Sequence, residues 1–190
     1  MKKMMSFIIL FALCTCLYKP VIHVSSSQLL NQRVIVLDPG HGGLDNGASI
    51  AGVDEDELNL KISFALKEEL ESRGATVYMT RTDDQDMTRR NYNYSKQDDM
   101  YLRALKIDEY QPDLFLSIHL NSSNSSAWGS QVFYYKKSED GKRLADSIHN
   151  QMKTLTGTRK NISSSSFYIL RATQSLGVLI ECGFLSNANE

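Results

Sequence analysis

Short apolar runs alternate along this chain with segments whose apolar residues have helical spacing, and this pattern restricts the fold most. Strands are predicted at 33–38, 75–80, 114–120, 129–135, 167–170 and 178–181, and helices at 58–73, 99–110 and 144–155. Strands that alternate with helices favour a mainly parallel sheet covered on both faces. We therefore expect an α/β fold, a three-layer sandwich whose mainly parallel, mixed central sheet is flanked by helices.

The N-terminal residues have a different character. Two lysines precede an apolar run from Met4 to Tyr18, which is typical of a secretory signal peptide or an uncleaved membrane anchor. We assign residues 1–27 to this segment, 28–32 to a linker and 33–190 to one catalytic domain. Contact with a membrane is expected only through the N-terminal segment. The domain ends in the turn-like stretch SNANE, where a terminal helix would be natural, so a C-terminal truncation stays open.

Charge and cysteine content exclude some classes of protein. The formal net charge is -1, so no electrostatic case exists for a nucleic-acid partner. Of the three cysteines, two lie in the N-terminal segment and only Cys182 belongs to the domain, which therefore cannot hold an internal disulfide. We interpret Cys182 as a small core residue. An exported protein without disulfides fits a bacterial envelope.

Four polar residues lie where the predicted elements begin or end. His41 follows the first strand, His119 lies near the end of the third, and Glu181 ends an apolar run. Glu55 begins the first helix. Because the carboxyl ends of parallel strands meet at one edge of a sheet, we expect these side chains to converge. Taken singly, His119 is more typical of a core histidine and Glu55 of a solvated helix start, whereas an unpaired Glu181 would be costly to bury.

Two histidines and two glutamates can provide the groups of a zinc hydrolase. A catalytic zinc site has three protein ligands of this kind, with water in the fourth position. The metal polarises a carbonyl oxygen and lowers the pKa of the water, and a free carboxylate can move the proton to the leaving amine. The sequence therefore predicts a zinc-dependent hydrolase, although the spacing of these residues matches no short metal motif such as HExxH.

Several longer segments add a family resemblance. They are VIVLDPGHGGLDNGA, DEDELNL, LFLSIHLNSS, FYILR and VLIECGFLSNANE. In this order they resemble the zinc-dependent N-acetylmuramoyl-L-alanine amidases of bacterial cell walls over essentially all of the domain. The resemblance implies one Zn²⁺ per chain, held by His41, Glu55 and His119, and a catalytic role for Glu181. The acidic run around Glu55 departs from the basic residue that is common there in the family, which leaves Glu57 open as an alternative ligand.

Within this family the chain is most similar to the spore-cortex amidases of spore-forming bacteria. The short hydrophobic leader, a single domain and the stretch YSKQDDMYLRALKI support this. The resemblance implies a peptidoglycan substrate, cut between the lactyl group of muramic acid and L-alanine, in the formation of the muramic-δ-lactam needed for germination. It also implies export to the cell envelope or the forespore intermembrane space, secreted or membrane-anchored, and a lipoprotein activator like that of clostridial relatives.

Other residues are candidates for substrate binding. Asn121 follows the third strand and is expected to support the ligands. Arg171 is either a partner for a stem-peptide carboxylate or an exposed surface residue. The 82–98 loop is a candidate surface for substrate or partner, or else a solvated loop. It carries Arg89, Arg90, Tyr92 and Tyr94. We interpret His149 as a surface residue of the last helix.

Two other functions stay open. A zinc peptidase acting within the stem peptide would release an amine other than that of L-alanine. A wall-binding relative without catalysis would be expected to have lost at least one of the four site residues, and all four are present.

Overall fold

A six-stranded sheet forms the centre of the molecule. The structure, a computed structural model, describes residues 29–89 and 94–190. The strands lie in the order β4-β1-β5-β8-β6-β7. Their bounds are β1 (Val34–Pro39), β4 (Thr76–Met79), β5 (Leu114–Asn121), β6 (Gln131–Tyr135), β7 (Ser163–Ser165) and β8 (Gly177–Phe184). All neighbouring pairs are parallel except β6 and β8, which are antiparallel.

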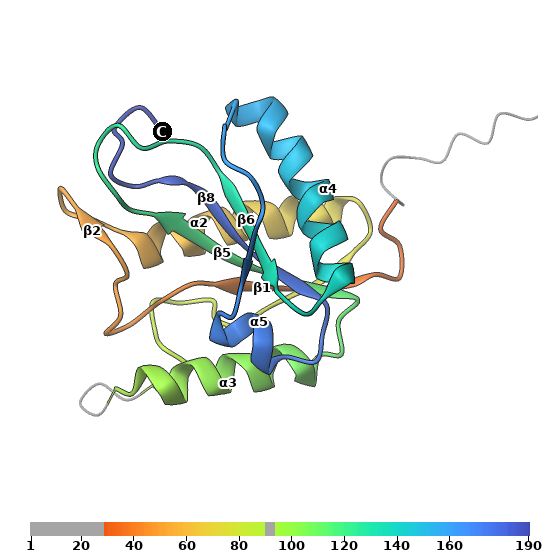
Figure 1. The fold of residues 1–190 in the computed structure, drawn as a ribbon. Coiled ribbons are helices and arrows are strands. Elements are labelled where there is room, and N and C mark those ends of the chain that lie inside the picture. Colours follow the sequence, from red (N-terminus) through yellow and green to blue (C-terminus); the bar gives the residue numbers. More distant parts are fainter. Residues whose placement is uncertain (1–28, 90–93) are drawn as a thin grey trace, which may run out of the picture.

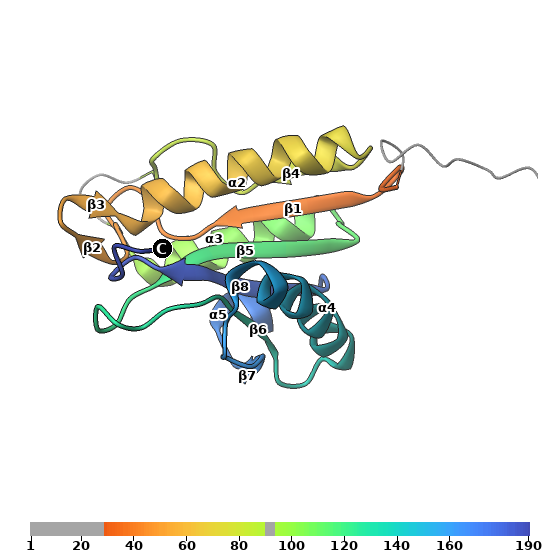
Figure 2. The same ribbon diagram turned by 90° about the horizontal axis from the view of Figure 1, so that it is seen from above.

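Helices cover both faces of this sheet. On one face lie α2 (Glu55–Ser72) and α4 (Glu139–Thr156), and on the other lie α3 (Lys96–Glu109) and α5 (Tyr168–Ala172) (Figure 1). In Figure 2, α2 and α4 lie in front of the sheet. A small hairpin of β2 (Ser49–Ile50) and β3 (Val53–Asp54) precedes α2. The predicted three-layer α/β sandwich with a mainly parallel, mixed sheet is confirmed.

Four strands of the sheet, β1, β5, β6 and β8, supply two apolar cores. In β1, Ile35 and Leu37 join the core under α2 and α4, whereas Val36 joins the core under α3 and α5. Successive residues of a strand point to opposite faces. This is why the run VIVL is apolar throughout rather than alternating.

Local signals fix the helix ends. Ser95 and Ser138 cap α3 and α4 by accepting hydrogen bonds from the N–H groups of Asp98 (3.2 Å) and Gly141 (2.9 Å). The α4 helix ends at Gly157, whose φ of 64° is left-handed. The α2 helix has no capping side chain, but its acidic first turn suits the positive end of the helix dipole.

One prediction of secondary structure is wrong, and the helix predicted at 99–110 is confirmed with a different start. The predicted strand at 167–170 is the start of α5, whose Ile169 and Leu170 are buried on the α3 side of the sheet. A short apolar run does not distinguish a strand from a buried helical turn. The helix predicted from 99 begins three residues earlier, at Lys96, because Ser95 provides the cap.

The interpretation of His149 as a surface residue is also wrong. The side chain is buried, and its Nε2 lies 3.0 Å from the carbonyl oxygen of Lys160. A polar partner in the segment after α4 allows this burial.

The predicted N-terminal segment lies outside the described residues. In the ranges that are described, none of the helices combines the length and the apolar character that crossing a membrane requires.

Candidate active site

His41 lies in a tight loop directly after β1. Its backbone φ is 61°, in the left-handed region that residues other than glycine rarely adopt. The N–H of Gly40 donates to the carbonyl of Ile118 on β5 (2.9 Å), and the N–H of Gly42 donates to the carbonyl of Asp45 (2.9 Å). A residue stays in such a conformation only where its surroundings hold it. The hydrogen bonds of the two neighbouring glycines help to hold His41 in this conformation.

Two buried arginines hold the same loop through its carbonyl oxygens. Arg81 donates from Nε to Pro39 (3.1 Å) and from Nη2 to Gly40 (2.9 Å). Arg103 donates from Nη1 to Pro39 (2.7 Å) and from Nη2 to the carbonyl of His41. Both guanidinium groups are almost fully buried. The position of the His41 backbone is therefore fixed from the segment after β4 and from α3 as well as from its own strand.

The charge of Arg103 is balanced within the protein. It forms ion pairs with Asp38 (3.0 Å) and Asp99 (2.7 Å). Asp38 also accepts hydrogen bonds from the hydroxyls of Thr80 (2.7 Å) and Ser117 (2.8 Å). Burial would raise the pKa of Asp38, but Arg103 and the two hydroxyls hold it below its usual value. A network of paired buried charges thus lies directly under the His41 loop.

Glu55, the first residue of α2, is buried, and both of its carboxylate oxygens accept hydrogen bonds. Its Oε1 accepts from the backbone N–H of Leu120 (3.2 Å) and from the side-chain amide of Asn59 (3.3 Å), and its Oε2 accepts from the N–H of Ala48 (2.9 Å). Burial would raise the pKa of Glu55, but hydrogen bonds to the two histidines of the site lower it. The side chain is therefore a fixed, charged carboxylate.

His41, Glu55 and His119 converge on one point. His41 Nε2 and His119 Nδ1 lie 3.3 Å and 3.1 Å from Glu55 Oε1, and one donor atom from each residue lies within 4.8 Å of the other two. Ligand atoms placed tetrahedrally at about 2.1 Å from zinc are about 3.4 Å apart. The cluster therefore fits a metal ion in both ligand type and separation.

Two glycines allow this close approach. A Cβ atom on Gly40 would lie 2.2 Å from the ring of His119, and one on Gly47 would lie 2.5 Å from Glu55 Oε2. Any larger residue at either position would displace a donor of the cluster.

The second ring nitrogen of His41 is held by Asp45. Nδ1 lies 3.0 Å from Asp45 Oδ2, and the same oxygen lies 3.1 Å from Lys96 Nζ and 3.3 Å from the Tyr94 hydroxyl. A carboxylate in this position fixes the tautomer and the ring orientation of a metal-binding histidine. Burial would lower the pKa of His41, but hydrogen bonds to Asp45 and Glu55 outweigh it and raise the pKa to about 9 in the metal-free site.

Glu181 lies next to the cluster but outside it. It is paired in register on β8 with His119 on β5. Its Oε2 is buried and has no hydrogen-bond partner among the described residues. Burial raises the pKa of Glu181 and the charge of Glu55 raises it further, while His119 and His41 lower it. A carboxyl group with a raised pKa is suited to both accept and donate a proton.

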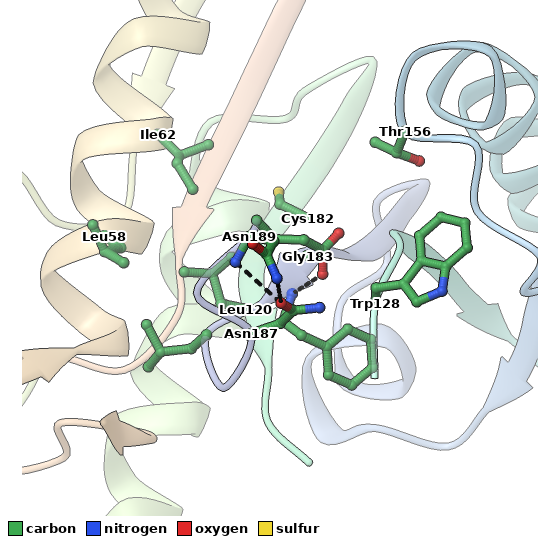
Figure 3. A pocket seen from close by; sticks show the side chains of 12 residues that line it. Leu58, Ile62, Leu120, Trp128, Thr156, Cys182, Gly183, Asn187 and Asn189 are labelled. Carbon is green, nitrogen blue, oxygen red and sulfur yellow. Dashed lines mark hydrogen bonds between the residues drawn. The ribbon is translucent and has the colours of Figure 1, made fainter. Parts of the chain in front are cut away.

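The cluster opens into a cavity of about 340 Å³ on the α3 side of the sheet. His41, His119 and Glu181 line it. A larger cavity, of about 700 Å³, has a mainly apolar lining and none of the four predicted site residues (Figure 3). Leu58 and Trp128 are among the side chains that surround it. The smaller cavity is therefore the candidate active site.

Glu55, and not Glu57, joins the cluster. Glu57 is exposed and pairs with Lys61 at 3.2 Å. The side chain of Asn121 accepts a hydrogen bond from the N–H of Ser122 (2.8 Å). Asn121 does not line either cavity, and its role in supporting the ligands stays a prediction.

Arg171 is directed at a neighbour in its own helix. Its guanidinium lies 4.7 Å from the centre of the Tyr168 ring. Tyr168 lines the smaller cavity and Arg171 does not. The predicted contact between Arg171 and a substrate carboxylate stays a prediction.

In the 82–98 loop, one of the residues proposed for contact with substrate or partner lies at the site. Tyr94 contacts Asp45, whereas Arg89 pairs with Asp83 at 3.5 Å. Arg90 and Tyr92 lie outside the described residues.

Four residues that hold the site were missed from the sequence: Asp45, Lys96, Arg81 and Arg103. Asp45 follows His41 by four residues, but spacing within a loop predicts no contact. Charged side chains are rarely buried, and nothing in the sequence marks Arg81 or Arg103 as exceptions. The one available signal was Ser95, which as a helix cap would have placed Lys96 at the start of α3.

Comparisons with known proteins agree with this geometry. The family model for N-acetylmuramoyl-L-alanine amidase matches residues 35–190. The germination-specific N-acetylmuramoyl-L-alanine amidase of Bacillus subtilis (strain 168) is 35% identical over 167 residues, which cover 85% of this chain and 70% of the relative.

Solved structures extend the likeness to three dimensions. The CwlD amidase from Clostridioides difficile, determined in complex with the GerS lipoprotein, has a TM-score of 0.73 and 33% identity over 83% of this chain and 85% of its own. The catalytic domain of CwlV, from Bacillus (Paenibacillus) polymyxa var. colistinus, has a TM-score of 0.70 and 30% identity over 83% and 84%. With the family model matched over nearly the whole described domain, this chain belongs to the N-acetylmuramoyl-L-alanine amidases.

Proposed function

We propose that this amidase depends on zinc and hydrolyses the amide between the lactyl group of muramic acid and L-alanine in peptidoglycan stem peptides. The observation that carries the proposal is a cluster of three metal-binding donors beside a separate buried carboxylate, for which residues 29–89 and 94–190 provide no hydrogen-bond partner. His41, Glu55 and His119 hold one Zn²⁺ per chain. Glu181 is left free to move protons.

The four residues have distinct tasks. When bound, zinc supplies Lewis acidity, which polarises the amide carbonyl and makes water a stronger nucleophile. Glu181 accepts a proton from the attacking water and delivers it to the nitrogen of the leaving L-alanine as the C–N bond breaks. The products are the lactyl carboxylate and a free amine.

The surrounding residues keep these groups in place. Asp45 orients the His41 ring, and Arg81 and Arg103 hold the loop that carries it. We propose Asn121 and Arg171 as additional residues on the substrate side of the site.

The relatives support a finer proposal about the biological role. The Bacillus subtilis relative is named for germination, and the Clostridioides difficile structure contains a lipoprotein. By analogy, we propose that this enzyme acts in the spore cortex, in the formation of muramic-δ-lactam needed for germination. A lipoprotein is proposed as its activator. Residues 1–27 would then serve as a signal peptide or membrane anchor for export to the envelope or the forespore intermembrane space.

Metal analysis and product analysis test the enzymatic proposal together. Purified enzyme is expected to contain one zinc per chain, and His119→Ala is expected to lose most of it. His149→Ala is the matched control, because His149 is also a buried histidine but lies on α4, away from the cluster. Equal zinc content in the two variants would refute the ligand set.

Digestion of purified muropeptides identifies the bond that is cut. We expect a new N-terminal L-alanine. Any other new N-terminal residue would identify a peptidase acting within the stem peptide. No new amine with the zinc-loaded protein, both alone and together with the proposed lipoprotein activator, would favour a wall-binding role without catalysis.

A further inference from the structure

The cavity beside Glu181 has both a cationic and an apolar wall. Lys96 and Met100 come from α3, and Phe167 and Tyr168 lie at the start of α5. The two histidines of the cluster line the same cavity. A substrate whose amide is at the cluster therefore has its neighbouring groups between these walls.

Lys96 is the lining cation that can take a ligand. Its side chain is 64% exposed and its Nζ contacts Asp45 Oδ2 at 3.1 Å, while an ammonium group has three N–H donors. The second lining cation, Arg103, is buried. Its guanidinium donates to Asp38, to Asp99 and to backbone carbonyls.

Lys96 is also close to the cluster. One oxygen, Asp45 Oδ2, contacts both Lys96 Nζ and His41 Nδ1, the latter at 3.0 Å. One extended residue of a peptide spans about 3.5 Å. A carboxylate bound by Lys96 therefore belongs to a residue one or two positions from the scissile amide.

We propose that Lys96 determines specificity by binding a free carboxylate of the substrate peptide, one or two residues beyond the cleaved bond; this rests on the proposed function. In peptidoglycan the residue after L-alanine is a glutamate joined through its side-chain carboxyl group, so its α-carboxylate is free unless it has been amidated. Lys96 selects the form with the free carboxylate. Phe167 and Tyr168 form an apolar wall of the same cavity, beside which the uncharged groups of the peptide can pack.

Arg171 fits this role less well. Its guanidinium lies 4.7 Å from the centre of the Tyr168 ring. Tyr168 lines the cavity, but Arg171 does not. Lys96 faces the cavity directly.

Two synthetic substrates test the proposal. Both are muramoyl-L-alanyl peptides, and the residue after alanine carries either a free α-carboxylate or a carboxamide. Rates are expressed per bound zinc, since Lys96 also contacts Asp45. Wild-type enzyme is expected to favour the carboxylate substrate about fivefold in kcat/KM, mainly through KM, and added salt should shrink the preference.

Three variants make the result specific. Lys96→Met is expected to bring the ratio of the two kcat/KM values close to one, and Lys96→Arg to keep the preference. Lys61→Met is the matched control, because Lys61 is similarly exposed and also pairs with an acidic residue, at 3.2 Å, but on α2. It should keep the wild-type ratio.

The outcomes separate the two proposals. Equal cleavage of both substrates by wild-type enzyme, or an unchanged ratio in Lys96→Met, would overturn the assignment of Lys96 alone. Cleavage of neither substrate by zinc-loaded enzyme would overturn the proposed function together with it.

Discussion

Neighbouring residues of β5 and β8 line two cavities that differ in chemistry. His119 and Glu181 line the cavity of about 340 Å³, whereas Leu120 and Cys182 line the cavity of about 700 Å³. Successive residues of a strand point to opposite faces of the sheet. A step of one residue on β5 or β8 therefore separates a polar site from an apolar hollow. Our assignment of the active site does not rest on volume. It rests on the cluster of metal-binding side chains and on a carboxylate that has no hydrogen-bond partner in the described part of the chain.

The two regions also differ in what supports them. Side chains of the α2–α4 core pack around the larger cavity, while the smaller one rests on the paired charges of Asp38, Asp99 and Arg103. Substitutions in the two regions should therefore have different consequences.

The largest effect is expected for Arg103→Met. Removing one partner of a buried ion pair leaves the others uncompensated, at a cost of roughly 3–5 kcal/mol in the free energy of unfolding. Urea denaturation measures this. Arg73→Met removes an exposed pair with Glu69 and should change stability much less. Equal changes in the two variants would show that the charges under the smaller cavity are not structural.

Asp45→Asn should act on metal affinity rather than on the fold. Loss of the carboxylate that orients His41 is expected to weaken zinc binding about 10- to 100-fold. Competition with a chelator measures the affinity. Asp113→Asn is the control, since Asp113 also pairs with a cation, Arg33 at 2.9 Å, but lies directly before β5 and outside the cluster. An unchanged zinc affinity in Asp45→Asn would show that Asp45 does not support zinc binding by His41.

Zinc uptake should release protons. The pKa of His41 is about 9 in the metal-free site, so its ring is protonated at pH 7.5 and must lose about one proton to bind zinc. Apparent zinc affinity is therefore expected to fall as the pH is lowered from 9. Titration in weak buffer with a pH indicator measures the release. Uptake without proton release would contradict the role of His41.

The smallest effect is expected in the larger cavity. Trp128 is 39% exposed there, and Trp128→Ala should leave zinc content and turnover per zinc close to wild type. A large loss of turnover with zinc retained would show that the larger cavity also takes part in catalysis.

The sequence predicted the layers of the fold, and it singled out His119 and Glu181, for a simple reason. Buried strands are apolar, so His119 and Glu181 are conspicuous at their ends, and parallel strands bring such ends together. The identity of Glu55 as the cluster glutamate came from the family resemblance. It could not come from the pattern, because Glu57 lies in the same acidic run.

Other features depend on contacts that a sequence pattern does not contain. Arg81 and Arg103 are polar residues whose burial follows from the backbone carbonyls and carboxylates around them. The 167–170 segment was assigned to a strand because its apolar run is too short to reveal a helical period. His149 is buried through a contact with the Lys160 carbonyl, in the segment beyond its own helix.

The most direct test compares two adjacent residues of β8 that face opposite cavities, Glu181 and Cys182. The measurement is turnover per bound zinc on a muramoyl-L-alanyl peptide. Glu181→Gln is expected to bind zinc normally and to lose at least about 100-fold in turnover, while Cys182→Ala stays close to wild type. Retained turnover in Glu181→Gln, or a comparable loss in Cys182→Ala with zinc still bound, would contradict the assignment of catalysis to the smaller cavity.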